Sequence, residues 1–524
     1  MNPTRDDQVG GLVRYGQPAG RWVLLATVLG SGLAFVDSTV VNIALPRIGD
    51  DFHAGAAALQ WTVNGYTLSL ASLILLGGSL GDRFGRRRIF VVGVVWFAIA
   101  SLLCGLAPSE EILVAARVLQ GIGGALLTPG ALAILGASFH PDDRAKAIGA
   151  WSGLGGIAGA LGPFLGGWLV EVASWRLVFL INVPLAAVVA LVAIRHVPES
   201  RDPDAPDRFD VVGLLTGAAG LAGLTYGFTA WPTAGPQSPT VLVTLAVGVA
   251  GMIGFVVAER RSSHPMLPLE VFRIRAFSAV NLVTFAVYAA LGGVFFLVVL
   301  NLQVVVGFSP LAAGTAMLPV TVLMLLLSAR AGALGQRIGP RIPMTVGPAV
   351  CAGALVLLAG VGSRTSYLTG VLPAVLLLGL GLSLTVAPLT ATALGSVDER
   401  HAGIASGVNN AVARAAGLLA VAVLPLAAGI GAGSLTDAAD LGPVYRVAML
   451  ICAGLLLLGS VIALVGVPSR LPGQRQSAEP DVPSGADDPI SPVRVHCAVD
   501  SPPLHPQPTD GPVAGGRAGA SERR

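Results

Sequence analysis

Long apolar blocks separated by short polar turns run along almost the whole chain. Each block is about 18–24 residues long, the length that a helix needs to cross roughly 30 Å of hydrocarbon at about 1.5 Å per residue. The alternating segments of about ten residues that mark a membrane β-barrel are absent. The pattern therefore predicts an all-α polytopic membrane protein with about fourteen transmembrane helices. The expected spans are 22–44, 59–80, 89–107, 111–135, 146–170, 177–195, 210–230, 240–258, 277–300, 310–329, 343–361, 367–390, 402–428 and 446–467.

Composition agrees with this pattern. Of the 524 residues, 54% are hydrophobic and only 12% are charged, whereas soluble domains carry roughly 25% charged residues. Three of the 4 cysteines lie inside apolar blocks, and no cysteine spacing indicates a disulfide framework or a metal site. Paired acids and a phosphate-binding loop are missing as well, so we expect neither an enzyme nor an ATPase. We expect no signal peptide, because the polar start of the chain leads directly into a full-length span.

The positive charges between the blocks indicate how the chain is oriented. Even-numbered spans are followed by turns rich in arginine, and odd-numbered spans by turns such as 231–239 and 302–309, which have no basic residues. Since basic loops stay in the cytoplasm, both termini are expected there. The basic residues behind this assignment are Arg83, Arg86, Arg87, Arg88, Arg144, Lys146, Arg195, Arg201, Arg208, Arg260, Arg261, Arg273, Arg275, Arg330, Arg337 and Arg341.

A short repeat divides the chain into halves. Residues 78–88 read GSLGDRFGRRR and residues 332–342 read GALGQRIGPRI, and each copy follows the second span of a group of six. Repeated halves around a midplane binding site are a transporter architecture. We therefore expect two six-helix bundles and two inserted helices. The expected domains are a cytoplasmic N-terminal segment (1–21), an N-terminal bundle (22–200), an insert with flanking linkers (201–271), a C-terminal bundle (272–467) and a disordered cytoplasmic tail (468–524).

The first copy of the repeat combines closely spaced glycines with an acid and four arginines. A basic turn that only sets topology explains the arginines, but it does not explain an acid at a helix end. The alternative is a cytoplasmic gate, in which Asp82 pairs across the two halves in one state and releases in the other. Both interpretations stay open; Gln336 replaces the acid in the second copy, so only the first can form this ion pair. The candidate gate residues are Gly78, Gly81, Asp82, Arg83, Gly85 and Arg86.

Three ionisable residues stand out inside the expected spans: Asp37, Arg117 and Arg414. Each costs roughly 2.5–3.5 kcal/mol at the centre of a membrane helix, so such residues are seldom present without a function. Asp37 and Arg117 lie about 12 Å and about 9 Å from the external ends of their spans, so they share one layer. Small residues lie on the same helical face as each charge. The two stripes consist of Gly30, Ala34, Asp37 and Val41, and of Arg117, Gln120, Gly121 and Gly124.

Two interpretations fit the acid and the arginine of this layer. They form either a static ion pair that fixes helix packing, or a carboxylate that exchanges its proton as the neighbouring guanidinium moves. Arginine does not titrate, so Asp37 is the candidate proton carrier, and we favour this role because buried ion pairs are poor stabilisers. Arg414 lies near the midplane, and no span of the second half contains an acid. Its hydrogen bonds are satisfied either by backbone carbonyl groups and the side chain of Asn409 or Asn410, or Arg414 contacts substrate or takes part in proton coupling.

The fifth span contains GLGGIAGALGPFLGGWL, from Gly153 to Leu169. Close packing of small residues explains the glycines, while Pro163 among them favours a hinge or a proton-tight seam between the halves; we expect both. Further polar residues in the spans indicate a moderately polar interior, although any one of them more often forms an interhelical hydrogen bond than a ligand contact. The candidate cavity residues are Asn64, Tyr66, Gln120, Asn301, Gln303, Asn410 and Arg414.

Together these segments resemble the fourteen-helix drug:proton antiporter branch of the major facilitator superfamily, from about Trp22 to Val467. DSTVVNIALP from Asp37 resembles its acidic first-helix motif, GSLGDRFGRRR its cytoplasmic loop signature, and RVLQGIGGA from Arg117 the motif whose arginine is implicated in proton coupling. WRLVFLINVP, NLQVVVGFSPLAAG and AGIASGVNNAVARAAG, which begin at Trp175, Asn301 and Ala402, are also similar to that branch. The residues that resemble the antiporter motif of exporters are Gly159, Gly162, Pro163, Gly166 and Gly167.

The resemblance implies a secondary active transporter of a bacterial plasma membrane, which exports a small hydrophobic drug or natural product in exchange for protons by alternating access. The proton gradient is then the energy source, with no cofactor and no nucleic-acid partner, and the protein is expected to be a monomer. Some relatives that export cations are thought to use extra membrane acids, and the spans from 277 to 467 contain none. A neutral or anionic substrate is therefore expected. The alternatives are proton-coupled uptake of a metabolite, and a non-transporting membrane receptor or scaffold.

Overall fold

The computed structural model describes residues 12–202, 210–262, 265, 267–397, 402–429, 435 and 437–469. Within two helices, the side chains of residues 141, 142, 145, 152, 153, 155–160, 402–404 and 406 are also outside the description. Most of the expected N-terminal segment and nearly all of the expected tail therefore lie outside the described residues. All described helices belong to one compact unit, Met1–Arg475.

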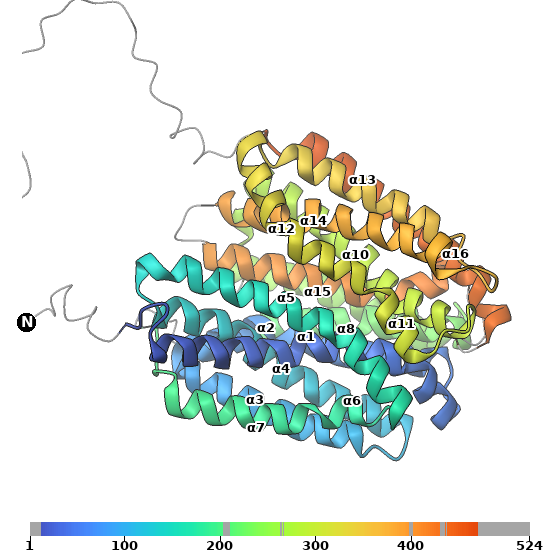
Figure 1. The fold of residues 1–524 in the computed structure, drawn as a ribbon, viewed down its shortest axis with the longest axis horizontal. Helices are drawn as coiled ribbons and strands as arrows, with labels where there is room; N and C mark the ends of the chain where they lie inside the picture. Colours follow the sequence, from blue (N-terminus) through green and yellow to red (C-terminus); the bar gives the residue numbers. More distant parts are fainter. Residues whose placement is uncertain are drawn as a thin grey trace, which may run out of the picture. The chain divides into compact units, whose positions relative to one another are not determined.

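The regular structure of the described residues is helical, apart from one isolated bridge between Val13 and Phe139. Figure 1 shows these helices in the order of the chain. They are α1 (Pro18–Phe52), α2 (Ala56–Phe84), α3 (Arg86–Gly105), α4 (Glu110–Ser138), α5 (Pro141–Val172), α6 (Leu177–Leu180), α7 (Asn182–His196), α8 (Val211–Ala234), α9 (Pro239–Arg261), η1 (Leu269–Arg273), α10 (Arg275–Val304), α11 (Pro310–Ala316), α12 (Leu318–Ile338), α13 (Arg341–Leu358), η2 (Tyr367–Val371), α14 (Leu372–Gly395), α15 (Ala402–Ala427) and α16 (Ala438–Gly466).

Thirteen helical segments of the described residues are long and apolar enough to cross a membrane. Three of them join consecutive elements: α6 with α7, α11 with α12, and η2 with α14. The remaining expected span corresponds to α5, a helix of 32 residues whose apolar part within the description is Leu161–Val172. Each expected span thus matches a helix or a pair of consecutive elements, and the predicted all-α polytopic membrane fold is confirmed.

Proline accounts for several helix starts. Pro18, Pro239, Pro310 and Pro319 occupy the first two positions of α1, α9, α11 and α12, where a backbone N–H has no helical partner to lose. Other prolines, such as Pro163 in α5, lie inside a helix. Membrane helices tolerate them because neighbouring helices and side chains satisfy the freed carbonyl groups.

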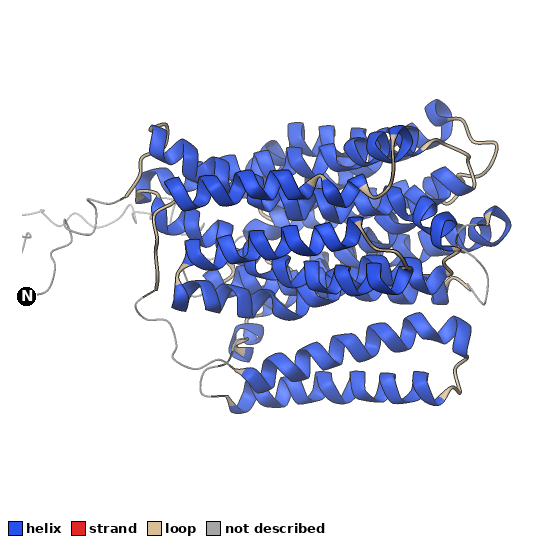
Figure 2. Cartoon of the chain, turned by 90° about the horizontal axis from the view of Figure 1, so that it is seen from below, coloured by secondary structure: helices blue, strands red, loops and turns tan. Residues whose placement is uncertain are grey.

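The helices pack in two groups and a hairpin. We call α1–α7 the N-half and α10–α16 the C-half, because most contacts of these helices are made within each group. Helices α8 and α9 pack mainly on each other, and α8 also contacts α2 and α15. Between the halves, α5 packs on α11 and α12, α1 on α10, and α2 on α15. Figure 2 shows that the helices lie side by side with their axes along one direction.

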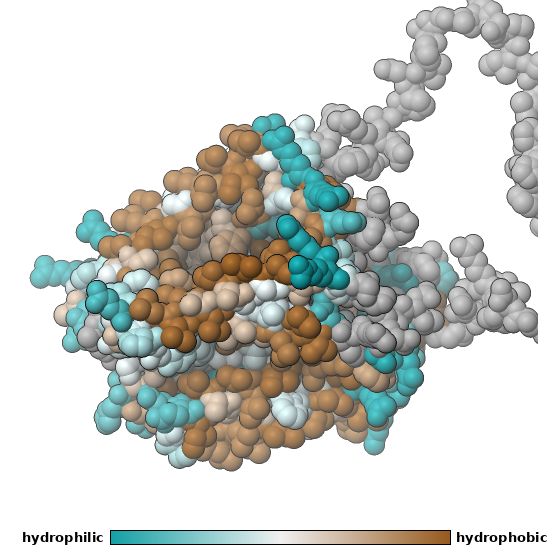
Figure 3. Space-filling view, turned by 180° about the vertical axis from the view of Figure 1, so that it is seen from behind, coloured by the Kyte–Doolittle hydropathy of each residue, from teal (hydrophilic) through white to brown (hydrophobic). Residues whose placement is uncertain are grey.

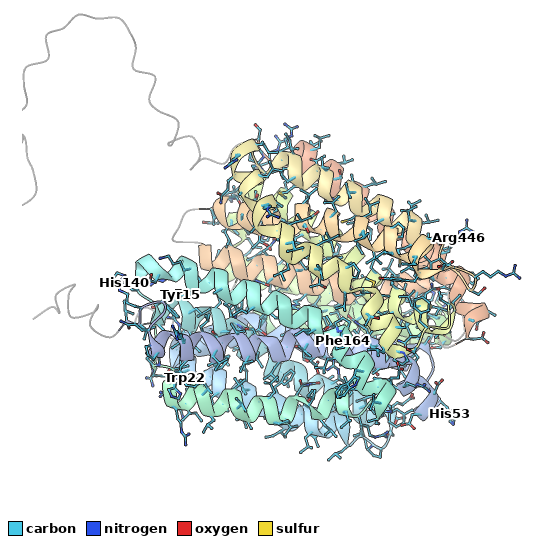
Figure 4. The ribbon with its side chains drawn as sticks, in the orientation of Figure 1. Tyr15, Trp22, His53, His140, Phe164 and Arg446 are labelled. Atoms are coloured by element: carbon cyan, nitrogen blue, oxygen red, sulfur yellow. The ribbon has the colours of Figure 1, made fainter. Side chains whose placement is uncertain are left out.

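The two ends of the bundle carry different residues. Tyr15, Trp22 and His140 lie at the end where α1 begins, which we call the amino-terminal end, and His53 and Arg446 lie at the opposite end (Figure 4). Between these ends the surface is broadly apolar, with polar groups gathered towards the ends (Figure 3). This band includes many large exposed apolar side chains that a lipid bilayer would cover. Examples are Ile99, Leu161, Ile194, Leu215, Ile253, Leu282, Leu326 and Leu458.

Candidate functional site

Asp37 of α1 and Arg117 of α4 form a fully buried ion pair. The distance between Arg117 Nη1 and Asp37 Oδ2 is 2.6 Å, and the side chains are 1% and 0% exposed. The prediction that the two charges share one layer and face each other is confirmed. Removing one partner of such a pair would leave an uncompensated charge in the interior, so the two residues depend on each other.

Three further side chains hold the Asp37 carboxylate and its surroundings. Gln120 Nε2 donates to Asp37 Oδ1 at 2.8 Å, while Arg117 Nη1 donates to Gln120 Oε1 at 2.6 Å. Asn182 Nδ2 at the start of α7 donates to the same Asp37 Oδ1 at 3.2 Å. Ser101 Oγ of α3 accepts from both Gln120 and Asn182, and donates to the Phe179 carbonyl. The carboxylate thus accepts from side chains of α4 and α7, and Ser101 of α3 bonds to two of these donors. We call Asp37, Ser101, Arg117, Gln120 and Asn182 the Asp37 network.

The Arg117 guanidinium is also fixed from outside this network. Its Nε donates to the Thr62 carbonyl at 2.9 Å, and the group lies over the Tyr66 ring at 4.5 Å from the centroid. This needs a close approach of α2 to α4, and glycine provides it. A Cβ on Gly121 would overlap the Tyr66 backbone, and a Cβ on Gly65 would lie 3.3 Å from the Val114 carbonyl oxygen. The small residues of the predicted stripe therefore serve helix packing around the charge.

This arrangement is suited to a two-state proton site. When Asp37 is ionised, it accepts from three donors and balances the Arg117 charge. When it binds a proton, the ion pair is lost and one carboxyl oxygen becomes a donor, so the same donors no longer fit. Protonation therefore favours a rearrangement of α1 relative to α4 and α7. Among the side chains of the network, the Asp37 carboxyl is the one whose chemistry allows proton exchange near neutral pH, since amides and arginine do not titrate there.

The turn between α2 and α3 is held by the N-half itself. Asp82 Oδ1 accepts from Arg86 Nε at 2.8 Å, so the acid is paired one helical turn away rather than across the halves. Gly85 has a φ of 115°, a conformation that residues with a side chain rarely adopt. The candidate gate residues Gly78 and Gly81 have neighbours only at ordinary contact distance, and the Arg83 guanidinium lies over the Phe84 ring.

A segment after α7, residues 197–202, binds this turn, and sequence reasoning missed it. The Arg86 N–H donates to the Ser200 carbonyl at 2.9 Å, and the Asp202 N–H donates to the Asp82 carbonyl at 3.0 Å. Glu199 accepts from the Arg87 N–H at 3.1 Å and pairs with its guanidinium at 3.6 Å. The acid two residues after Val197 is the only signal in the sequence that pointed to this contact.

Helix α5 uses its glycines to pack both on α1 of its own half and on α11 of the other half. Gly162 and Gly166 face α1, where a Cβ on Gly166 would lie 3.1 Å from Val40. Gly167 faces α11, where a Cβ would lie 2.5 Å from the Pro310 carbonyl oxygen, and a Cβ on Gly314 would overlap the Pro163 carbonyl. The expected contact of this motif between halves is therefore present. The surroundings of Gly159 lie outside the described residues.

Two side chains strengthen this seam near the opposite end. Glu171 Oε2, at the end of α5, accepts from the Leu311 N–H at the start of α11 at 3.1 Å. Gln303 Nε2 of α10 donates to the Ile43 carbonyl of α1 at 3.1 Å. Glu171 was missed from the sequence, and Gln303, one of the cavity candidates, bonds across the halves.

The remaining cavity candidates differ in their surroundings. Gln120 belongs to the Asp37 network, and Asn301 is fully buried and donates to the Val361 carbonyl at 3.3 Å. Asn64 and Tyr66 are buried, and neither the Asn64 amide nor the Tyr66 hydroxyl has a hydrogen-bond partner in the described part of the chain. Asn410 is exposed, and Arg414 is partly exposed. The described residues hold no group of three or more His, Cys, Asp or Glu side chains placed to bind a metal ion.

Comparison with known proteins agrees with this geometry. The family profile described as Major Facilitator Superfamily matches residues 27–421. A puromycin resistance protein from Streptomyces alboniger is 38% identical over 467 residues, which cover 86% of this chain and 92% of that protein. The tetracenomycin C resistance and export protein from Streptomyces glaucescens is 37% identical over 406 residues, covering 76% of this chain and 74% of that protein.

Solved structures give the same fold at low sequence identity. A transporter of the POT family in complex with a thioalcohol-conjugated peptide has a TM-score of 0.65 and 14% identity, covering 87% of this chain and 98% of that chain. A bacterial homologue of the human lysosomal transporter Spinster has a TM-score of 0.61 and 19% identity, covering 86% and 97%. With the profile match and these relatives, the chain is a multi-pass membrane protein that belongs to the Major Facilitator Superfamily.

Proposed function

We propose that this protein exports a small hydrophobic antibiotic or other natural product from a bacterial cell in exchange for protons. The relatives named above are antibiotic resistance and export proteins, and a further relative, 36% identical over 405 residues, is a methylenomycin A resistance protein of Bacillus subtilis. The protein acts as a transporter rather than as an enzyme, and it resides in the plasma membrane with both termini in the cytoplasm.

The observation that carries proton coupling is the buried Asp37 network. Asp37 lies on α1, a helix that packs on α5 of its own half and on α10 of the other half. Proton uptake from the exterior would weaken the contact with Arg117 and change the packing of α1. Proton release to the cytoplasm would restore the pair, so each cycle moves protons inward and substrate outward.

The contacts between halves support an assignment of this structure to a state that is closed at the end opposite the termini. The α5–α11 seam, Glu171 and Gln303 close the end opposite the termini. At the amino-terminal end, Asp82 is paired with Arg86 of its own half, as the gate interpretation requires of its released state. Substrate would then enter from the cytoplasm, consistent with export.

Two other functions compete with this proposal. Proton-coupled uptake of a metabolite would use the same network with the substrate moving in the other direction, and the names of the relatives favour export. A receptor or scaffold would need neither a buried titratable network nor a glycine seam between halves. Proton-coupled uptake is therefore the stronger competitor.

Transport by the purified protein in liposomes tests the proposal. Puromycin, tetracenomycin C and methylenomycin A serve as probes, and a proton gradient of either polarity is imposed. We expect at least one probe to accumulate against its gradient, driven by protons that move the opposite way, and accumulation to stop when an uncoupler is added. Substrate that moves in the same direction as protons, or that moves unaffected by the uncoupler, would contradict the proposal.

A further inference from the structure

Arg414 is a partly exposed cation inside the bundle that the Asp37 network does not use. It forms no hydrogen bond and no ion pair with any residue that the structure describes. On the same helix, a Cβ on Gly407 would lie 3.3 Å from the Leu75 side chain of α2. Seven residues are about two helical turns, so Arg414 lies on this same face and points from the C-half towards α2.

Its depth is close to that of the Asp37 network. Seven residues correspond to about 10 Å along α15, and an equal distance along α2 from Leu75 leads back to within a turn of Tyr66. This placement agrees with the packing of α15 on α2 between the halves. Tyr66 in turn lies under the Arg117 guanidinium. Arg414 thus faces the network across the two halves.

In the part of the chain that the structure describes, no carboxylate pairs with this cation. The described residues of α10 to α15 contain no Asp or Glu. Across the halves, Asp37 already accepts from Arg117, Gln120 and Asn182. A cation inside a membrane protein without such a partner is costly, so a ligand with a negative group would relieve that cost when it binds.

We infer that Arg414 binds an acidic group of the transported compound, and that the substrates are hydrophobic organic acids with a carboxylate or an ionised phenol. This inference rests on the proposed function and names its substrate class. The planar guanidinium donates two parallel N–H groups to the two oxygens of one carboxylate, which fixes the orientation of the ligand. Asn410 precedes Arg414 by about one turn on the same side of α15 and is exposed, so it adds a polar edge to this site.

Equilibrium binding to the intact protein in lipid nanodiscs tests the inference with two matched probes, anthraquinone-2-carboxylate and its methyl ester. We expect the acid to bind about tenfold or more tightly than the ester. Arg414→Gln should remove this difference by weakening the acid alone, and Arg414→Lys should keep part of it. The control is Arg446→Gln, at the opposite end of the bundle, which should bind both probes as the parent protein does (Figure 4).

Equal binding of acid and ester by the parent protein would overturn the inference, as would an equal loss of both in Arg414→Gln. If Arg414→Gln does not fold, Arg414→Lys decides, because a loss of both probes in that variant contradicts acid recognition. Transport in liposomes separates this inference from the proposed function. A parent protein that binds the acid selectively but moves neither probe would contradict export and leave the Arg414 assignment standing.

Discussion

The donors around Asp37 come from separate parts of the chain, and each is itself held by a second contact. Gln120 and Asn182 both reach Asp37 Oδ1, and Ser101 accepts from both of them. In a buried network of this kind, removal of one member leaves others without partners, so the effects of single substitutions do not add. The network therefore links one carboxylate to side chains of three helices around α1, and we expect its protonation to change their packing.

Removal of the arginine tests this dependence. Arg117→Gln leaves the Asp37 carboxylate buried without its counter-ion, a loss that costs about 3–5 kcal/mol in buried pairs. We expect a clear drop in the thermal unfolding temperature of the purified protein. The double variant Asp37→Asn with Arg117→Gln removes both charges and should recover much of the lost stability. A double variant no more stable than Arg117→Gln would show that the pair does not act as a unit.

At this scale the sequence predicted the charged pair, but not the neutral residues Ser101 and Asn182 that hold it. Asp37 and Arg117 are conspicuous because an ionised group inside an apolar span is rare and costly. Ser101 and Asn182 are neutral, and small polar residues occur in membrane helices for many reasons. Which of them meets Asp37 depends on the rotation of α3 and on the break between α6 and α7. Neither can be derived from residue spacing within a single helix.

Among the helices, α5 and α11 form the contact that depends most on glycine. A Cβ at Gly314 would overlap the Pro163 carbonyl, which belongs to the backbone and cannot turn away. Gly314→Ala should therefore separate α11 from α5 and shift the equilibrium away from the state in which the opposite end is closed. Gly454→Ala in α16 is the matched control, because no atom lies within 4 Å of the added Cβ.

Spin labels on His53 and Arg446 report this shift, since both lie at the opposite end, one on each half (Figure 4). We expect longer distances between the two labels in Gly314→Ala and an unchanged distribution in Gly454→Ala. The same distribution in both variants would mean that the glycine seam does not control closure.

The elements themselves were predictable because each apolar block had to be a helix, and the fourteen expected spans match the observed elements. The contacts between loops could not be predicted from the sequence. The segment 197–202 follows a span without any repeat or motif, yet Glu199 and Ser200 bind the α2–α3 turn. Such a contact depends on where two distant loops meet, and a local pattern of charges does not encode that position. The expected domain boundaries stay predictions.

For the whole molecule, the proposed orientation predicts which end faces the exterior. In a variant with all 4 cysteines replaced by serine, a single cysteine is placed at His53 or at Tyr15, at the opposite and amino-terminal ends of the bundle. An impermeant maleimide should label the cysteine at 53 in intact cells, and the cysteine at 15 only after permeabilisation. The reverse result would mean that the arginine-rich turns lie outside, against the expected topology.

Proton-coupled export by Asp37→Asn is the most direct test of the account. Asparagine has nearly the same shape and keeps a hydrogen-bonding group at this position, but it cannot exchange a proton. In liposomes containing the purified variant, we expect substrate to equilibrate across the membrane without accumulation, and no proton movement to accompany it. Accumulation of substrate by Asp37→Asn at the parental rate, with protons still moving the opposite way, would contradict the central claim.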